Sequence, residues 1–395
     1  MSIRMTIYPD ECDSFGHLNQ ASYLALFERA RWELLARGPG MNVFAEAGVW
    51  PAVRRATIDY HAGAWPGDVL EFTTELAGRG RTSFTLRQQA SRTRDGRLVA
   101  TLETVFVCID RDERPVAVPD TVLAAIAATP RHTTLASGQA MAWDGAGQGG
   151  VAVLFVHGYP LDRTMWREQL VGVTGHRLIA PDLRGFGDSA DAPAAETIDA
   201  HADDLAALLD ALGIERAVVV GLSMGGYIAL AMAERHRHRL AGLVLADTRA
   251  GADDAKAREG RAQAISAIEK GGAAAVLDGL AAKLFAPSTL IGVRESVEAR
   301  MQGVPGPTLV ASLAAMRDRP DRTGLLPSLA GLPTLVLVGS DDVITPPEEA
   351  RAMAAAIPGA ELVEVEGAGH LAPVERPATV NEALQAFLDR VARGV

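Results

Sequence analysis

The chain has 395 residues, a net charge of −11 and 48% hydrophobic residues, and only two of its residues are cysteines. This length suits two domains better than one. The acidic balance argues against nucleic acid as the main partner, and no apolar stretch is long enough to cross a bilayer. The first residues lack the apolar core of a signal peptide, and Cys12 and Cys108 have no disulfide or metal-ligand pattern. We therefore expect a cytoplasmic protein that needs no cofactor or metal and has no membrane partner.

The first 130 residues are predicted to form one helix and several long strands. The pattern indicates a short strand over 3–8, a helix over 20–36 with a broad apolar face, and four strands between residues 52 and 109. Turn signals such as Arg94-Asp95-Gly96 separate these strands. One long helix against antiparallel strands gives an α+β domain in which the sheet wraps the helix.

A polar turn directly before this helix carries the pattern D-x-x-G-H-x-N-x-x-x-Y, at Asp13, Gly16, His17, Asn19 and Tyr23. With the element order, the pattern resembles the hotdog-fold acyl-CoA thioesterases of the 4-hydroxybenzoyl-CoA thioesterase and YbgC type, over roughly residues 1 to 125. The resemblance implies that Asp13 is the catalytic carboxylate, acting as nucleophile or general base, while backbone N–H groups face the thioester carbonyl. It also implies a homo-oligomer formed through this domain, with the site at the interface.

Two alternatives stay open for this segment. His17 and Asn19 are explained as well by capping of a local turn as by contact with a substrate. The domain can also keep its fold and its pairing without turnover, which would make it a platform that joins two copies of the other half.

The junction is expected to be a linker at residues 129–134, followed by the first strand of a new domain at 135–143. The next stretch, Asp144–Gly150, contains G-x-G-x-x-G but precedes a strand, whereas a dinucleotide site needs a helix there. We interpret it as a hairpin loop.

From about residue 135 onward, short apolar strands alternate with helices, which indicates a mostly parallel sheet covered on both faces. Its central motif is G-x-S-x-G at Gly221–Gly225, between an apolar strand end and a helix. Small residues two before and two after the apex permit a sharp turn that exposes a serine hydroxyl. Ser223 is therefore the expected nucleophile.

Further motifs follow other strands of this region: HG-x-P at His157–Pro160, D-x-R-G-x-G-x-S at Asp182–Ser189, an acidic loop at Gly339–Pro346 and a histidine loop at Gly367–His370. Together they resemble the α/β-hydrolase superfamily. An insertion at about 248–323, where the alternation stops, resembles the helical cap that these enzymes place over the active site.

The resemblance assigns a role to each motif, because Ser223, Asp342 and His370 follow one another in the order of nucleophile, acid and histidine. His370 would take the serine proton while Asp342 fixes the histidine tautomer. Asp341 is the competing acid, but the spacing G-x-x-D-x-x-x-P favours Asp342. Backbone N–H groups of Tyr159 and Met224 would hold the oxyanion.

Two other groups of side chains are interpreted as structural. His157 is expected to hold the HG-x-P loop. Arg249 and Arg258 at the start of the cap have two interpretations, contact with a substrate carboxylate or ordinary exposed helix charge, and we favour exposed charge.

The sequence thus predicts an N-terminal α+β hotdog domain at 1–130 and a C-terminal α/β-hydrolase domain with a helical cap at 135–395. The expected function is a serine hydrolase that cleaves carboxylic esters, with thioesters and lactones as related substrates, fused to an acyl-CoA thioesterase-like domain. Two alternatives remain: a hydrolase paired by a silent hotdog platform, and a cofactor-free perhydrolase that uses the same three residues. A dehalogenase is disfavoured because the turn carries Ser223 where that chemistry uses an aspartate.

Overall fold

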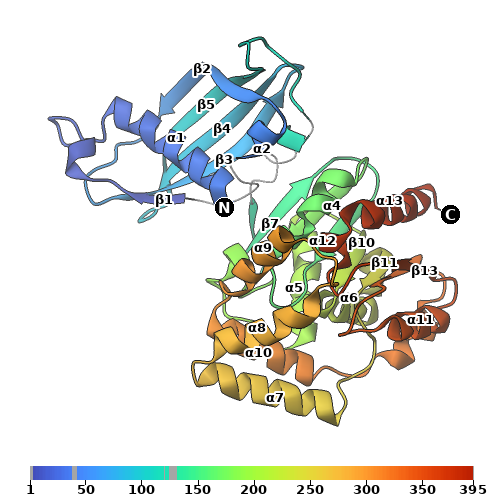
Figure 1. Ribbon diagram of the computed structural model, residues 1–395. Helices are drawn as coiled ribbons and strands as arrows, with labels where there is room; N and C mark the ends of the chain where they lie inside the picture. Colours follow the sequence, from blue (N-terminus) through green and yellow to red (C-terminus); the bar gives the residue numbers. More distant parts are fainter. Residues whose placement is uncertain (1–2, 38–41, 120, 124–130, 395) are drawn as a thin grey trace. The chain divides into compact units, whose positions relative to one another are not determined.

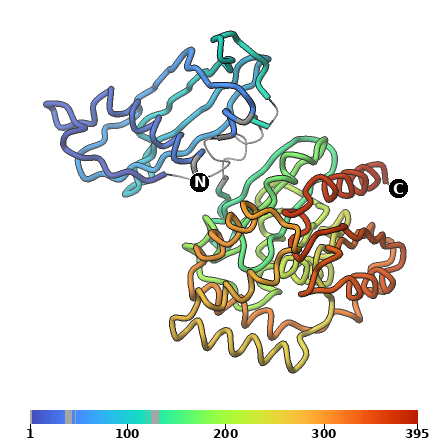
Figure 2. The backbone as a smooth tube through the Cα atoms, viewed as in Figure 1, coloured from blue at the N-terminus to red at the C-terminus, as the bar shows by residue number. Residues whose placement is uncertain are grey.

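The computed structural model describes residues 3–37, 42–119, 121–123 and 131–394. The chain divides into two compact units, which we call unit 1 (Met1–Arg131) and unit 2 (His132–Val395). There is one sheet of five strands and one of eight (Figure 1, Figure 2). In the ranges that the structure describes, no helix is both long and apolar enough to span a membrane.

The sheet of unit 1 is antiparallel, with the order β1–β3–β4–β5–β2. Helix α1 (Gln20–Arg37) lies along one face of this sheet (Figure 1). The shorter helices are η1 (Pro9–Glu11) and α2 (Asn42–Glu46). The strands are β1 (Ile3–Thr6), β2 (Trp50–Tyr60), β3 (Val69–Arg79), β4 (Ser83–Arg92) and β5 (Arg97–Ile109).

The contact between α1 and the sheet forms the first core of unit 1. Apolar residues of α1 are buried at the helical spacing of three and four, and Phe27 packs edge-on against Phe72 of β3, with ring centroids 5.1 Å apart. A second apolar cluster gathers around Phe84 and Phe106. This is the predicted arrangement of one helix wrapped by an antiparallel sheet.

The sheet of unit 2 has the order β13–β12–β11–β10–β8–β9–β7–β6. It is parallel from β13 to β9, and β7 runs antiparallel to β9. All six residues of the central strand β10 are buried, as expected for a parallel strand covered on both faces. The strands are β6 (Arg131–Thr134), β7 (Ala140–Ala146), β8 (Ala152–Val156), β9 (Arg177–Pro181), β10 (Ala217–Leu222), β11 (Leu240–Ala246), β12 (Thr334–Gly339) and β13 (Glu361–Val365).

Four α-helices between β11 and β12 form the cap, which Figure 2 shows as the yellow-to-orange stretch of the chain. They are α7 (Ala255–Glu269), α8 (Ala273–Leu284), α9 (Ile291–Met301) and α10 (Gly306–Arg317). The remaining helices are η2 (Arg163–Trp166), α4 (Arg167–Gly172), η3 (Gly187–Ser189), α5 (Ile198–Ala211), α6 (Met224–Arg235), η4 (Arg237–Arg239), η5 (Thr323–Leu329), α11 (Pro347–Ala356), α12 (Ala372–Glu375) and α13 (Pro377–Arg393).

The junction differs from its prediction in two ways. Residues 131–134, expected as linker, form the edge strand β6, while residues 129–130 lie outside the described ranges. The expected hairpin at Asp144–Gly150 is wrong, because β9 lies between β7 and β8 in the sheet. The hairpin assumed that two strands adjacent in sequence, β7 and β8, also pair in the sheet. The later strand β9 lies between them instead.

Candidate active site

Ser223 stands at the apex of a sharp turn between β10 and α6. Its backbone has φ 53° and ψ −113°, a conformation that residues with a side chain rarely adopt. A Cβ on Gly221 would lie 2.1 Å from the carbonyl oxygen of Gly225, and a Cβ on Gly225 would lie 2.2 Å from the carbonyl oxygen of Val156. Only glycine therefore fits on either side of the serine, for the steric reason expected from the motif.

The structure brings Ser223, His370 and Asp342 into one hydrogen-bonded line. His370 Nε2 lies 2.8 Å from Ser223 Oγ, and His370 Nδ1 lies 2.8 Å from Asp342 Oδ2. Because a carboxylate only accepts, Nδ1 carries the proton and Nε2 is left to accept from the serine hydroxyl. Three loops, which follow β10, β12 and β13, contribute these side chains.

The carboxylate of Asp342 is surrounded by donors from its own loop. The N–H groups of Ile344 (2.8 Å) and Thr345 (2.9 Å) bond to Oδ1, and the Thr345 hydroxyl donates to Oδ2 at 2.6 Å. Burial acts to raise the pKa of Asp342, but hydrogen bonds from His370 and Thr345 outweigh it and lower that pKa. The competing acid, Asp341, is exposed and accepts instead from the hydroxyl of Ser340.

The HG-x-P loop runs directly beside the serine. A Cβ on Gly158 would lie 3.4 Å from Ser223 Cβ. His157 is fully buried, its Nε2 accepts from Leu183 N–H at 3.0 Å, and its Nδ1 lies 3.0 Å from the carbonyl oxygen of Gly158. Burial lowers the pKa of His157 to about 4, so this ring is neutral and ties the loop to the segment after β9.

Tyr159 and Met224 are the two predicted oxyanion donors. Met224 follows Ser223 in the sequence, and Tyr159 belongs to the HG-x-P loop beside it. Both residues are buried, and Met224 is the first residue of α6, where helix N–H groups lack intrahelical partners. The hydrogen bonds among the described residues leave both backbone N–H groups unpaired. Unpaired buried N–H groups are rare unless a ligand or water takes the bond.

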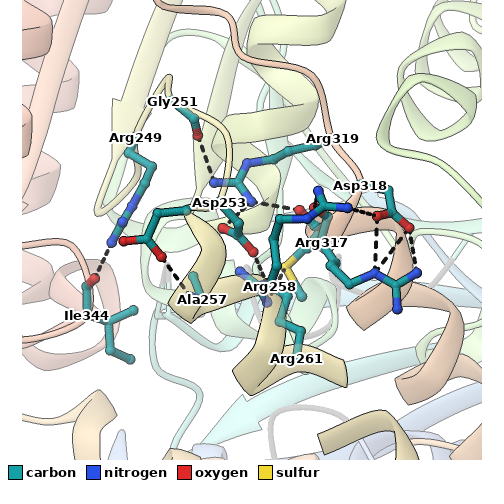
Figure 3. A network of polar contacts seen from close by, with 12 residues as sticks. Arg249, Gly251, Asp253, Ala257, Arg258, Arg261, Arg317, Asp318, Arg319 and Ile344 are labelled. Atoms are coloured by element: carbon teal, nitrogen blue, oxygen red, sulfur yellow. Dashed lines mark hydrogen bonds and ion pairs between the residues drawn. The ribbon is translucent and has the colours of Figure 1, made fainter. Parts of the chain in front are cut away.

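The arginines at the start of the cap are bound to protein groups (Figure 3). Arg249 donates to the carbonyl oxygen of Ile344 and lies 3.6 Å from Glu349. Arg258 donates to Asp318 at 2.9 Å and to the carbonyl oxygen of Arg317 at 2.7 Å. Arg258 is thus an exposed charge with a surface partner, and Arg249 ties the start of the cap to the loop that carries Asp342.

In unit 1, the motif residues gather around the N-terminus of α1. Asp13 is exposed, and its Oδ1 accepts from the N–H groups of Phe15 (2.9 Å) and His17 (3.1 Å) within its own turn. Asn19 caps α1 by accepting from Ser22 N–H at 2.9 Å. The His17 ring packs edge-on against Trp65. Of the two residues for which turn capping was the alternative, Asn19 caps within one chain, whereas the His17 side chain packs against an aromatic ring.

Tyr23, the last residue of that motif, lies on α1 and is buried against the ring of Tyr60, with centroids 5.2 Å apart. Burial raises its pKa to about 12, so the phenol stays protonated at neutral pH.

Two buried carboxylates near His370 were missed by the sequence reasoning. Asp247, which follows β11 with φ 44°, accepts from Gly339 N–H at 2.8 Å and from Ala372 N–H at 3.3 Å. Burial, followed by the nearby Asp342 charge, raises the pKa of Asp247 well above its usual range. Glu375 accepts from N–H groups on both sides of His370. Their partners lie up to 125 residues away, so no local spacing signals them.

Among the residues that the structure describes, no group of three or more His, Cys, Asp or Glu side chains is arranged to hold a metal ion.

Known families match both parts of the chain. Residues 151–377 match the alpha/beta hydrolase fold family, and residues 7–126 match the thioesterase-like superfamily. The first match covers more than half of the chain, which therefore belongs to the α/β-hydrolase family. Both resemblances stated from the sequence are confirmed, and with them the fold class of a hotdog domain followed by an α/β hydrolase with a helical cap.

Individual relatives within the α/β-hydrolase family indicate which kind of bond the chain acts on. A solved thermophilic esterase from Thermogutta terrifontis is 41% identical, with a TM-score of 0.63, and the match covers 67% of this chain and 100% of the esterase. A 3-oxoadipate enol-lactonase from Acinetobacter baylyi is 27% identical over 246 residues, 60% of this chain and 89% of the lactonase. These likenesses bear out the prediction of a hydrolase that acts on ester bonds.

A further relative belongs to another reaction class. The dihydrolipoyllysine-residue acetyltransferase component of the acetoin cleaving system from Pseudomonas putida is 32% identical over 253 residues, 61% of this chain. The chain spans 64% of that relative, less than two thirds of its length. Each match covers one part of the chain, so the activity, substrates and partners of the whole two-domain protein are a matter of proposal.

Proposed function

We propose that unit 2 is a serine hydrolase that cleaves carboxylic esters through an acyl-enzyme on Ser223. One observation supports this above all others: Ser223 Oγ, the His370 ring and the Asp342 carboxylate form a continuous line of hydrogen bonds of 2.8 Å at a strained turn. A serine hydroxyl is a weak nucleophile until a neighbouring base takes its proton, and this line supplies the base and the group that orients it.

The proposed reaction has two steps. Ser223 Oγ attacks the ester carbonyl while His370 Nε2 takes the hydroxyl proton, and the imidazolium returns that proton to the leaving alcohol. Water then attacks the acyl-serine carbonyl while His370 Nε2 takes a proton from it, and the imidazolium returns this proton to Ser223 Oγ as the bond to the acyl group breaks and the carboxylic acid leaves. Asp342 stays ionised throughout and stabilises the imidazolium.

The backbone N–H groups of Tyr159 and Met224 are the proposed donors to the oxyanion. Both N–H groups lack a hydrogen-bond partner among the described residues and lie on the two segments that flank Ser223. Loss of one such donor costs on the order of 10² to 10³ in rate. The cap that follows β11 would then select the acyl group, and thioesters or lactones are related substrates of the same chemistry.

Covalent trapping tests this proposal. The full chain is treated with a fluorophosphonate probe, digested, and the labelled peptide is sequenced by mass spectrometry. We expect a single label on Ser223, no label on Ser223→Ala, and loss of ester cleavage in step with labelling. A stoichiometric label on another residue, or undiminished ester cleavage by Ser223→Ala, contradicts the mechanism.

The second proposed activity is acyl-CoA hydrolysis in unit 1, with Asp13 as nucleophile or general base. The match to the thioesterase-like superfamily supports it, as does the side chain itself. Asp13 uses Oδ1 for its own turn, and among the described residues Oδ2 accepts no hydrogen bond. An exposed, free carboxylate oxygen is available to attack a thioester or to activate water. The alternative is that unit 1 is a silent platform.

We further propose a cytoplasmic homo-oligomer that pairs through unit 1. Strand β2 is one edge of the five-stranded sheet, and all eleven of its residues are exposed or half-buried, including Val53 with 56% of its surface exposed. A long unprotected edge strand is a template for pairing with another chain. Light scattering of the full chain should give at least a dimer, and Val53→Lys should shift it toward monomer, with Arg97→Glu on the neighbouring strand β5 as the charge-change control. A monomeric wild type contradicts the pairing.

A perhydrolase that uses the same three residues remains the competing chemistry for unit 2. Halogenation of a diketone dye in the presence of peroxide and bromide separates it from ester cleavage. Dye turnover that exceeds ester hydrolysis at equal enzyme concentration would favour the perhydrolase.

A further inference from the structure

The backbone around His370 is held by groups from outside its own loop. The N–H of His370 donates to the carbonyl oxygen of Leu284, at the end of the cap helix α8, at 2.8 Å. The N–H groups on either side of it, at Gly369 (2.9 Å) and Leu371 (3.2 Å), both donate to Oε1 of Glu375. Three consecutive N–H groups centred on the histidine are thus fixed by one cap carbonyl and one carboxylate oxygen.

The second oxygen of Glu375 bonds to the cap itself. Oε2 accepts from Ala286 N–H at 2.8 Å and from the hydroxyl of Thr289, both in the segment between α8 and α9. Glu375 and Thr289 are each only 8% exposed, and Ala286 is fully buried, so water does not compete for these bonds. One side chain therefore joins the histidine loop to the cap.

The backbone of the histidine loop and the backbone of the cap are in close contact along this junction. A Cβ on Gly369 would lie 2.6 Å from the backbone nitrogen of Ala286. On the cap side, Arg294 holds the segment closed by donating to the carbonyl oxygen of Ala286 at 2.6 Å. Backbone meets backbone directly beside the histidine, and any shift of residues 284–289 moves it.

All four groups that face Glu375 are donors, so the side chain must accept with both oxygens. Glutamine has nearly the same shape but carries an NH₂ in place of one oxygen. In either orientation its NH₂ faces a backbone N–H, which leaves a buried donor unsatisfied. The junction is therefore specific for a carboxylate.

We propose that Glu375 is a positioning residue that couples the cap to His370 and holds Nε2 at its distance from Ser223. The inference rests on the proposed serine-hydrolase function and adds a part to it, since Glu375 touches neither substrate nor reacting atoms. The cap then has a second task besides acyl selection: it completes the site by fixing the base.

The start and the end of the cap are joined to each other at a place separate from residues 284–289, which supplies a matched control. Asp253 accepts from Arg319 at 2.6 Å and also from Arg261 (Figure 3). Arg319 lies over the ring of Tyr227 on α6, 4.0 Å from its centroid. Asp253 is a cap carboxylate whose side chain is 3% exposed, and among the described residues it has no hydrogen bond to the histidine loop. Its loss loosens the cap without touching His370.

The test is steady-state ester hydrolysis by Glu375→Gln, Thr289→Val, Thr289→Ser and Asp253→Asn, with kcat divided by the number of sites that a fluorophosphonate titrates. Displacement of a catalytic group by about 1 Å costs on the order of 10² in rate, so we expect kcat of Glu375→Gln to fall about 100-fold, with KM changed less than threefold. Thr289→Val, which removes one donor, should lose about fivefold, the worth of one ordinary hydrogen bond. Thr289→Ser keeps the hydroxyl and should stay within about twofold of wild type.

Normalised kcat separates positioning from mere folding, because a variant that only unfolds loses titratable sites and keeps its rate per site. A wild-type kcat per site in Glu375→Gln overturns the proposal, and so does an equal loss in Asp253→Asn. If Glu375→Gln does not fold, the Thr289→Val and Thr289→Ser pair decides in the same way. Ser223→Ala is assayed in parallel. If it retains ester hydrolysis, both the serine mechanism and the positioning role of Glu375 are contradicted. If Ser223→Ala is inactive while Glu375→Gln has a normal kcat per site, the positioning role alone is contradicted.

Discussion

The serine site of unit 2 and the aspartate site of unit 1 are both built where a tight turn meets the first residues of a helix. Their surroundings differ. His370 and Asp342 are each 3% exposed, and backbone from the cap and from three strand ends closes around them. Asp13 is exposed, and among the described residues its side chain accepts hydrogen bonds within its own turn alone. Unit 2 encloses the first group of side chains, whereas unit 1 leaves Asp13 open on its own surface.

This difference has a physical consequence. A buried line of hydrogen bonds holds its geometry before substrate arrives, which is how electrostatic preorganisation contributes to rate. An exposed carboxylate has no such support from its own chain, and a second copy would have to cover it. We therefore expect the two sites to respond differently to the same kinds of change.

The largest expected effect comes from crossing two variants with two substrates. Ser223→Ala should reduce p-nitrophenyl ester cleavage by on the order of 10⁴ to 10⁶ and spare acyl-CoA cleavage. Asp13→Asn should reduce acyl-CoA cleavage by on the order of 10² to 10⁴ and spare the ester, because it removes only a general base or nucleophile of unit 1. Thiol release and nitrophenol release measure the two reactions.

The other outcomes of the crossing are equally informative. If Ser223→Ala abolishes both reactions and Asp13→Asn neither, unit 1 is the silent platform. If Asp13→Asn abolishes ester cleavage as well, the two sites are not independent and the comparison drawn above is wrong.

The second effect is on stability at the two turns. Gly225→Ala places a Cβ 2.2 Å from a backbone oxygen and should destabilise unit 2 by about 3 kcal/mol or more, the upper range for overpacking a tight site. Gly16→Ala in unit 1 meets no atom within 4 Å and keeps only the cost of its φ of +79°, about 1 to 2 kcal/mol.

Calorimetry of the full chain measures both changes. Gly260→Ala, in α7 with nothing within 4 Å of the new Cβ, is the control and should be neutral or slightly stabilising. Equal destabilisation by Gly16→Ala and Gly225→Ala would show that the first turn is as tightly enclosed as the second.

A site residue can be predicted from the sequence when the contacts that fix it lie close by in the chain. The turn at Ser223 was predictable because Gly221 and Gly225 stand within one five-residue motif, although the atom that excludes a side chain at Gly225 belongs to the distant Val156. The loops of Asp342 and His370 were predictable because each carries its own short motif. Asp247 was missed because both of its donors come from distant segments, and Glu375 because spacing does not reveal its two donors in the cap, Ala286 and Thr289.

The errors at the junction have the same origin. Residues 131–134 carry no strong apolar pattern, and they pair only because β7 offers its edge. The placement of β9 between β7 and β8 depends on how the whole sheet assembles, so the turn after β7 alone could not reveal it.

The smallest expected effect is a pH dependence confined to unit 2. Burial lowers the pKa of His157 to about 4, below the unfolded value of about 6.5, so the unfolded chain binds the proton more readily. This group therefore contributes stability that is present above pH 6.5 and lost as pH falls toward 4, and it should cost about 2 kcal/mol between pH 7 and pH 5. The described histidines of unit 1, His17 and His61, are exposed.

The measurement must isolate His157, because Asp182 acts with the opposite sign. Burial raises the pKa of Asp182 to about 7, so the folded state gains a proton, and stability, as pH falls. The contribution of His157 is therefore the difference between wild type and His157→Gln in how steeply the unfolding free energy changes with pH. The readout is the loss of esterase activity after brief exposure to acid. His157→Gln should be less stable at pH 7, since the bond to Leu183 N–H is disturbed, yet it should lose about 2 kcal/mol less than wild type on going to pH 5. Parallel slopes in the two proteins would mean that His157 titrates normally, and the enclosure that distinguishes the serine site from the aspartate site would not extend to this loop.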